Sequence, residues 1–261
     1  MKFETIRVTA ASEGVANLIL ARPEKHNALS ATMIAELSEA AELLGKDDTI
    51  RAVVLSGEGE SFCAGGDLAW MKQQFSASRA ERMSEARKLA MMLKALNEMP
   101  KFLVGKVHGN AFGGGLGMMS VCDVVIAADS ARFGLTETRL GLIPATISPY
   151  VMARIGEGNA RRIFMSARLF GASEAVSLGL ASKSVAPEAL DSAIEAEIAP
   201  CLAAAPGAIA ASKRLTRMLG MPIGEKQIEA TIAALADTWE SPESHEGVGA
   251  FFDKRKPNWA S

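Results

Sequence analysis

Two glycine-rich segments offer main-chain N–H groups that no side chain covers. One spans residues 109–117 and contains three consecutive glycines between an apolar strand and an apolar helix. The other spans residues 62–67. Glycine has no Cβ, so a ligand can approach its backbone closely. Two such N–H groups aimed at one oxygen atom form an oxyanion hole, so the pair predicts stabilisation of negative charge that develops on an oxygen.

One carboxylate is suitably placed to move a proton. Glu137 follows a short apolar segment, residues 133–135, and precedes the apolar residues 142–144. Apolar surroundings disfavour the charged carboxylate and raise its pKa towards the range in which it exchanges protons at neutral pH. A solvated loop glutamate is the alternative interpretation, and the sequence leaves both open.

Other site chemistries lack the required spacing. A dinucleotide-binding G-x-G-x-x-G would need glycine where Met118 or Phe62 stands, and no G-x-x-x-x-G-K-S/T occurs. The three histidines are far apart in the sequence, so no metal site is expected. No G-x-S-x-G marks a serine nucleophile, and Cys63 and Cys122 are expected to pack rather than to react.

The elements that would position these groups alternate between strand and helix. Apolar patterns predict strands at residues 5–8, 15–20, 52–55, 103–107, 124–127 and 132–135. Ser30 is expected to cap a helix, residues 76–99 to form one long helix that ends at Pro100, and residues 115–121 to form a short helix. This alternation predicts an α/β fold with a mostly parallel sheet.

The carboxyl-terminal part has a different pattern. From about Ala145 onward the periodicity is helical almost throughout, with breaks at Gly156, Gly171, Pro206 and Pro222. We therefore predict an α/β core over residues 1–195 and a helical region over residues 196–261, without a distinct linker between them.

The composition excludes several partners. The 261 residues include 28 basic and 30 acidic side chains, and no cluster of Lys and Arg suggests a nucleic acid or a membrane surface. Three cysteines without a C-x-x-C motif favour a reducing compartment. The amino terminus lacks the apolar core of a secretory signal, and no apolar run approaches the roughly 18 residues of a membrane span. A cytoplasmic protein is predicted.

Five motifs in order resemble the enoyl-CoA hydratase/isomerase family, also called the crotonase family. They are residues 22–29, 61–68, 109–123, 133–144 and 246–257. The resemblance spans nearly the whole chain. It implies an α/β spiral core of repeated strand-strand-helix units, a carboxyl-terminal helical trimerisation region, and a homotrimer or a hexamer built as a dimer of trimers.

The resemblance also implies the roles of single residues. The N–H groups of Gly66 and Gly114 would bind the thioester oxygen of an acyl-CoA, and Glu137 would transfer the proton. The residues implied to bind substrate and CoA are Lys25, Ala28, Ala64, Gly66, Asp67, Leu68, Ala69, Gly114, Phe251 and Lys254. Lys25 and Ala28 would lie near the nucleotide end of CoA, and a neighbouring subunit is one possible source of Phe251 and Lys254. Coenzyme A is then part of the substrate, and no separate cofactor is implied.

One position departs from the family pattern. Typical hydratases of the family carry a first glutamate in the helix after the triple glycine, whereas this chain has Gly117. The remaining Glu137 could shuttle a proton between two carbons, or act on a water that another group positions. The hydroxyl groups of Thr146, Ser148 and Tyr150 are candidates for orienting water, and helix capping and packing are their alternative roles.

A subfamily is also suggested. The Gly-Leu-Gly at residues 115–117 together with residues 147–150 is similar to hydratases of branched or dicarboxylic acyl-CoAs, such as the methylglutaconyl-CoA hydratases of leucine breakdown. Arg139 would then meet a substrate carboxylate, and a solvated arginine is the alternative.

The predicted function is hydration of a short or branched 2-enoyl-CoA through an enolate held in the oxyanion hole. Double-bond isomerisation is the alternative, because a single general acid/base suffices for it. A non-catalytic acyl-CoA-binding relative is a further alternative, against which the retained Glu137 argues.

Overall fold

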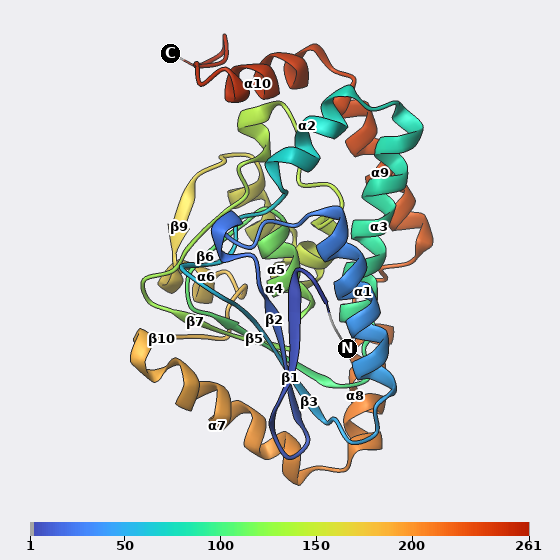
Figure 1. The fold of residues 1–261 in the computed structure, drawn as a ribbon, viewed down its shortest axis with the longest axis vertical. Helices are drawn as coiled ribbons and strands as arrows, with labels where there is room; N and C mark the ends of the chain where they lie inside the picture. Colours follow the sequence, from blue (N-terminus) through green and yellow to red (C-terminus); the bar gives the residue numbers. More distant parts are fainter. Residues whose placement is uncertain (1–2, 261) are drawn as a thin grey trace.

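The main sheet has six strands and is mostly parallel. The computed structural model describes residues 3–260 and is drawn in Figure 1. The strand order is β1-β2-β3-β5-β7-β10, in which β1 and β2 pair antiparallel and the other neighbours pair parallel. The strands are β1 (Ile6–Ser12), β2 (Val15–Leu20), β3 (Ala52–Gly57), β5 (Phe102–Val107), β7 (Val124–Ala128) and β10 (Lys183–Val185).

Helices cover both faces of this sheet, which explains its apolar strands. On one face, Leu190, Ile194 and Ile198 of α7 (Leu190–Ala203) pack against strand residues such as Val54 and Ile126. The other face carries the larger core, to which α1 (Ala31–Lys46), α3 (Arg79–Glu98), α4 (Gly114–Val121) and α5 (Ser148–Phe164) contribute. In Figure 1 the strands lie between α7 and the pair α1 and α3. A strand that is covered on both faces has a continuous run of apolar residues in its sequence, as β3 has over residues 52–55.

A smaller sheet continues from the ends of the main strands. Its order is β4-β6-β8-β9, and its strands are β4 (Ser61–Cys63), β6 (Asn110–Phe112), β8 (Arg132–Gly134) and β9 (Leu169–Gly171). Strands β4, β6 and β8 follow β3, β5 and β7 along the chain, and α2 (Leu68–Ser76) and α4 follow β4 and β6. The predicted α/β architecture of repeated strand-strand-helix units is therefore confirmed.

The helices predicted in the first half of the chain are present in the structure, which adds one that was not predicted. Ser30 caps α1 by accepting a hydrogen bond from the Met33 N–H at 3.2 Å. The helix predicted over residues 76–99 is α3, which begins only at Arg79 because Ser78 starts it with a capping box that includes Glu81. The preceding helix α2 was not predicted; Asp67 caps it.

The carboxyl-terminal part is less helical than its pattern predicts. Strands β9 and β10 interrupt it, and each adds an edge to one of the two sheets. The remaining elements are α6 (Ala172–Ser177), α8 (Pro206–Leu219), α9 (Glu225–Trp239), α10 (Pro242–Phe252), and the 3-10 helices η1 (Pro23–Lys25), η2 (Glu137–Leu140) and η3 (Pro187–Ala189). The predicted boundary between residues 195 and 196 falls inside α7. The division into two regions stays a prediction.

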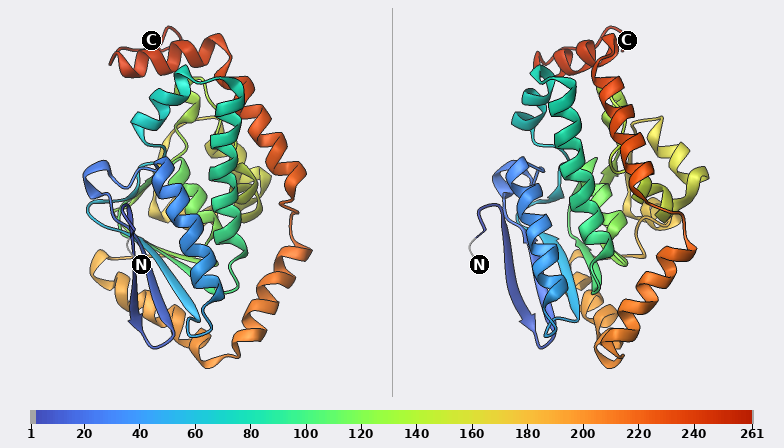
Figure 2. Two further views of the ribbon diagram at one scale, coloured as in Figure 1. Left: turned by 45° about the vertical axis from the view of Figure 1, so that its right-hand side comes forward. Right: turned by 90° about the vertical axis from the view of Figure 1, so that its right-hand side faces the viewer.

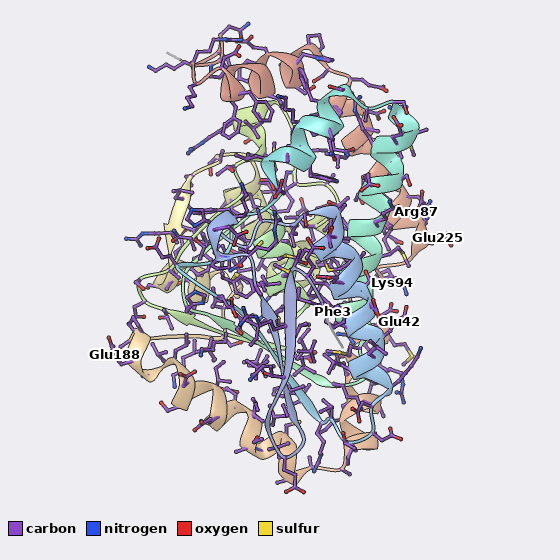
Figure 3. The ribbon with its side chains drawn as sticks, viewed as in Figure 1. Phe3, Glu42, Arg87, Lys94, Glu188 and Glu225 are labelled. Carbon is purple, nitrogen blue, oxygen red and sulfur yellow. The ribbon has the colours of Figure 1, made fainter. Side chains whose placement is uncertain are left out.

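Helix α9 returns along α3, far from it in the sequence. Ala86 and Ala90 of α3 form a small apolar cluster with Ile228 and Ile232 of α9. Arg87 of α3 also pairs with Glu229 of α9. Figure 2 shows the two helices side by side, and Figure 3 labels Arg87 beside the start of α9. This contact brings the carboxyl-terminal helices to the top of the core, where α10 crosses above α2 in Figure 1.

No single helix within residues 3–260 is long and apolar enough to cross a bilayer. Helices η3–α7 and α8 pass such a test of length and composition only as a pair, bent by 108°.

Candidate functional site

Three loops that leave neighbouring strands form the candidate site. Strands β4, β6 and β8 lie next to one another and run parallel. The carboxyl ends of parallel neighbours lie at one edge of a sheet, which is where α/β proteins bind ligands. Residues 64–66, 113–114 and 135–137 follow these three ends. The short sheet therefore brings Gly66, Gly114 and Glu137 to one place.

The first loop leaves the Gly66 N–H without a protein acceptor. Gly66 forms a parallel bridge with Leu29. The Leu29 N–H donates to the Gly65 carbonyl at 2.7 Å, and the Asp67 N–H donates to the Leu29 carbonyl at 3.0 Å. The bridge thus uses the groups on either side of Gly66, and the Gly66 N–H has no acceptor among the described residues.

The Asp67 carboxylate is held by partners within its own chain, and its predicted contact with the substrate stays a prediction. Its carboxylate accepts hydrogen bonds from the Ala69 N–H at 2.8 Å and the Trp70 N–H at 3.3 Å, which caps α2. It also pairs with Arg22 at 2.9 Å. Burial alone would raise the pKa of Asp67, but the hydrogen bonds from Arg22 and the two amides outweigh it and lower that pKa. Asp67 is therefore an ionised anchor for the turn.

The second loop presents the Gly114 N–H at the start of α4. Gly113 adopts a φ of 49°, a conformation that favours glycine, and its N–H donates to the Gly134 carbonyl at 3.1 Å. Gly114 is the first residue of α4, so its N–H has no partner within the helix, and no other described residue accepts from it. The positive end of the helix dipole adds to the attraction of negative charge there.

The two loops touch each other. A Cβ placed on Gly65 would lie 3.1 Å from the Phe112 carbonyl oxygen, and one on Gly114 would lie 3.9 Å from the Gly65 Cα. A Cβ on Gly115 would lie 2.7 Å from the Cys63 carbonyl oxygen. The glycines therefore permit a close approach of two backbones, which larger residues would force apart.

Glu137 projects a buried carboxylate beside the second loop. A Cβ on Gly113 would lie 2.9 Å from Glu137 Oε1, so this carboxylate packs against the glycine backbone. The other oxygen, Oε2, is fully enclosed and has no hydrogen-bond partner among the described residues. Burial raises the pKa of Glu137 to about 7, with only partial opposition from its own backbone N–H. The carboxyl group can therefore both accept and release a proton near neutral pH.

Helix α10 fixes the segment that carries Glu137. Gly141, which ends η2 with a φ of 68°, lies so close to α10 that a Cβ would meet the Glu243 carbonyl carbon at 2.4 Å. In the reverse direction, a Cβ on Gly247 of α10 would lie 2.5 Å from the Leu140 carbonyl carbon. Backbone-to-backbone packing on this scale leaves η2 little freedom to move.

These groups line one pocket of about 520 Å³. Gly66, Gly114 and Glu137 are at its strand-end side, and α2, α3 and α9 contribute the apolar residues Met71, Leu89 and Leu235. Of the other predicted residues, Ala64, Leu68 and Phe251 also line the pocket. The structure thus brings together six of the residues predicted for catalysis or CoA binding, together with Arg139 and Thr146, and places Phe251 in the pocket of its own chain.

The remaining predicted CoA-binding residues lie outside the set that lines the pocket. Lys25 is exposed on η1, and Ala28 is buried beneath it, where its carbonyl accepts from Arg22 at 3.0 Å. Ala69 lies in the first turn of α2, and Lys254 is exposed beyond the end of α10. Their proposed contact with CoA stays a prediction.

Two tryptophans of the pocket wall were not predicted from the sequence. Trp70 of α2 and Trp239 of α9 line the cavity, and Trp239 is almost fully buried. The spacing of Trp70 from the glycine turn could have placed it near the site. No local signal places Trp239, because its position depends on the packing of α9 against α3.

At Gly117, where the first glutamate of a typical hydratase would stand, the space beside the backbone is occupied by the side chain of Ile147. A Cβ on Gly117 would lie 2.6 Å from Ile147 Cγ2, and Ile147 itself is buried and lines the pocket. A longer side chain at position 117 would therefore collide with Ile147 unless that residue moved. Glu137 is the only acidic side chain that lines the pocket in the described part of the chain. Within residues 3–260, no group of three or more His, Cys, Asp or Glu could hold a metal ion.

Comparisons with known proteins agree on one family. The sequence profile described as enoyl-CoA hydratase/isomerase matches residues 10–261. A crotonyl-CoA hydratase of Syntrophomonas wolfei is 30% identical over 267 residues, which is 100% of both chains. The crystal structure of an enoyl-CoA hydratase from Shewanella pealeana is 34% identical, with a TM-score of 0.81 over 99% of this chain and 97% of that chain. That of an enoyl-CoA hydratase from Mycobacterium avium is 29% identical, with a TM-score of 0.88 over 98% and 99%.

Proposed function

This chain belongs to the enoyl-CoA hydratase/isomerase family, and we propose that it adds water to the double bond of a short or branched 2-enoyl-CoA. The observation that carries the proposal is the meeting of two unpartnered N–H groups and one buried carboxylate in a single pocket. Hydration of a thioester needs both parts, because it transfers protons and passes through an enolate.

The two N–H groups would stabilise the enolate. As water attacks C3, the electrons of the C2=C3 bond move towards the thioester, and negative charge collects on its oxygen. The N–H groups of Gly66 and Gly114 would donate to that oxygen from fixed positions, so no reorganisation is needed when the charge develops.

Glu137 would act first as base and then as acid. Its carboxylate takes a proton from the water whose oxygen bonds to C3, and the resulting carboxyl group gives a proton to C2. The overall result is H and OH added across the double bond, with Glu137 returned to its starting form. A pKa of about 7 suits both steps, because neither form is strongly favoured near neutral pH.

The pocket favours a compact apolar acyl group. Its wall is formed by side chains such as Leu89, Leu235 and Trp239, which exclude water from the acyl chain. Arg139 is the only basic side chain that lines the pocket in the described residues; it is exposed and forms no ion pair there. It is therefore free to meet a carboxylate at the end of a branched acyl chain, as the methylglutaconyl-CoA branch would require.

Two assays test this proposal. Loss of the conjugated thioester absorbance of crotonyl-CoA on incubation with the protein is the expected result, and no loss with any 2-enoyl-CoA would refute hydration. A panel of acyl-CoAs with and without a terminal carboxylate tests Arg139. A preference for the carboxylate that disappears in Arg139→Gln supports its role, whereas equal rates across the panel exclude it.

Isomerisation is a second candidate, and the Ile147 side chain beside Gly117 favours it. With an aliphatic group there, the pocket has one acidic side chain in its described lining, and one carboxylate suffices to move a proton between C2 and C4. A gain of conjugated thioester absorbance from a 3-enoyl-CoA, without consumption of crotonyl-CoA, would identify an isomerase. Binding without change to either substrate would instead indicate an acyl-CoA-binding protein that does not catalyse.

We further propose a cytoplasmic homotrimer or dimer of trimers in which α8 contributes to the interface. Its apolar residues Leu215, Met218 and Leu219 are 50%, 73% and 75% exposed in the single chain, and Lys213 is its only buried residue. An exposed apolar helix face of this kind is typical of an interface between subunits. Light scattering that gives a monomer at micromolar concentration would refute this assembly.

A further inference from the structure

We propose that the hydroxyl group of Thr146 binds the attacking water and orients it between Glu137 and the substrate. This inference rests on the proposed hydration and names a positioning residue for it. It starts from the polar groups of the pocket, since a water that attacks in one direction needs more than one hydrogen-bond partner.

Few side chains of the pocket can accept a hydrogen bond from water. An attacking water donates one hydrogen to Glu137, and its other hydrogen needs a second acceptor. Arg139 and the two tryptophans of the lining have only donors, and Trp70 already donates to Glu85 at 3.3 Å. The acceptor side chains that remain in the described lining are Thr136 and Thr146.

The three hydroxyl groups considered from the sequence differ in the structure. Ser148 donates to the Ala145 carbonyl at 2.6 Å, and Tyr150 donates to the Ala90 carbonyl at 3.3 Å. The hydroxyl of Thr146 has no partner among the described residues, and Thr146 alone of the three lines the pocket. Hydrogen bonds to backbone carbonyls therefore account for the hydroxyl groups of Ser148 and Tyr150, but not for that of Thr146.

Burial makes a bound water the natural partner of Thr146. The residue is only 6% exposed, but its hydroxyl oxygen, which has no partner among the described residues, is not fully enclosed. It therefore keeps accessible surface, and the pocket is the cavity that the residue lines. A nearly buried hydroxyl is unfavourable unless it is hydrogen-bonded, and a water in the pocket satisfies it.

The position of Thr146 is fixed by its neighbours. The Ala145 N–H donates to the Ile143 carbonyl at 2.8 Å, and the Ser148 N–H donates to the Ala145 carbonyl at 3.0 Å. The next side chain, Ile147, packs against Gly117 of α4. Thr146 thus lines the pocket from the segment that follows η2, whereas Glu137 lies at the start of η2. Thr136 precedes Glu137 directly and is less buried, so it is the weaker candidate.

In this arrangement Thr146 takes no proton. The water donates one hydrogen to the Thr146 oxygen and one to Glu137, and a lone pair of its oxygen is left to form the bond to C3. The O–H bond towards Glu137 breaks as the C–O bond forms. The geometry of the attack depends on Thr146, whereas the proton transfer depends on Glu137.

The experiment compares Thr146→Val, which replaces the hydroxyl by a methyl group of similar size, with Thr146→Ser, which keeps it. The kcat of Thr146→Val for hydration should be about tenfold below the parental value, as expected for one lost hydrogen bond to the reacting water. Thr146→Ser should recover most of the activity. Affinity for a saturated acyl-CoA should stay within twofold in both variants, because that ligand binds without the reacting water. Ser148→Ala, which removes a hydroxyl committed to the backbone, is the matched control and should retain parental kcat.

Several results would overturn the assignment. These are a Thr146→Val enzyme with parental kcat, a Thr146→Ser enzyme as slow as Thr146→Val, a parallel loss of acyl-CoA affinity, or a loss seen in Thr136→Val instead. If the parental protein hydrates no 2-enoyl-CoA, the proposed function itself fails, and the role of Thr146 fails with it.

Discussion

The strand-end side of the pocket and its helical wall are built on different principles. On the strand-end side, the active groups are two main-chain N–H groups and one carboxylate, placed by three adjacent strands of one short sheet. The wall is made of side chains from α2, α3 and α9, which are distant in the sequence. The comparison indicates that the chemistry depends on backbone geometry, while the choice of acyl group depends on side-chain packing.

Replacement of Glu137 should have the largest effect on the strand-end side. Glu137→Gln keeps the size of the side chain but cannot transfer the proton, so turnover should fall by about 10³-fold. Affinity for a saturated acyl-CoA should change little, because the N–H groups and the wall remain. Steady-state kinetics and calorimetric titration measure the two quantities. Substantial activity in this variant would remove Glu137 from the mechanism.

The Gly114 N–H can be deleted with a matched control. Proline is compatible with the first position of a helix and lacks the N–H, so Gly114→Pro should fold with α4 in place. Gly114→Ala introduces the same Cβ contact with Leu29, 2.6 Å away in the parent, but keeps the donor. We expect kcat of the proline variant to be about 10²-fold below that of the alanine variant, which is the typical cost of one lost oxyanion donor. Equal kcat values would show that this N–H does not contact the developing charge.

The ionised carboxylate of Glu137 should also lower the free energy of unfolding at alkaline pH. Its pKa is raised from 4.5 to about 7 on folding, so the folded state binds the proton more tightly than the unfolded state. Its contribution is therefore fully favourable below about pH 4 and is lost as the pH rises through 7. Glu137→Gln should be more stable than the parent by up to about 3 kcal/mol at pH 8, and the difference should vanish below pH 4.

Urea denaturation of both proteins across this pH range measures that difference. A constant difference in the free energy of unfolding would show that the carboxyl group does not titrate with a raised pKa. If Glu137→Gln is more stable than the parent at alkaline pH and has also lost turnover, the buried carboxyl group that catalysis needs lowers the stability of the folded protein.

The helical wall should respond more weakly and in a different quantity. Leu89→Ala shortens a partly buried wall residue, which removes about 1 kcal/mol of apolar contact with an acyl chain long enough to reach it. The KM for such a substrate should rise about fivefold, and kcat with crotonyl-CoA should stay near the parental value. A loss of kcat with crotonyl-CoA would contradict the separation of the two sides of the pocket.

Much of the strand-end side could be predicted locally. The glycine turns, the helix cap at Ser30 and the short helix after the triple glycine each have a signature in a few adjacent residues, and the structure contains all of them. The start of α3 was predicted at residue 76, although the signature of a capping box, Ser78 with Glu81, marks its first helical residue as Arg79, and α2 was not predicted.

The errors elsewhere have a common cause. Strands β9 and β10 have three residues each, too few to establish a period of two, and they are strands because an edge of a sheet is available to pair with them. The tryptophan on α9 lines the pocket only because α9 packs along α3, and no pattern within α9 encodes that partner.

The sequence by itself determined which groups are available: backbone N–H groups left open by glycine, one carboxylate in an apolar segment, and the absence of a second one at position 117. These are properties of single residues and short turns. Only the tertiary structure decided that the open N–H groups meet, that Glu137 is enclosed deeply enough for its pKa to reach about 7, and that Thr146 rather than Ser148 or Tyr150 keeps a free hydroxyl. Burial and convergence depend on contacts between segments far apart along the chain, and local sequence carries no record of those contacts.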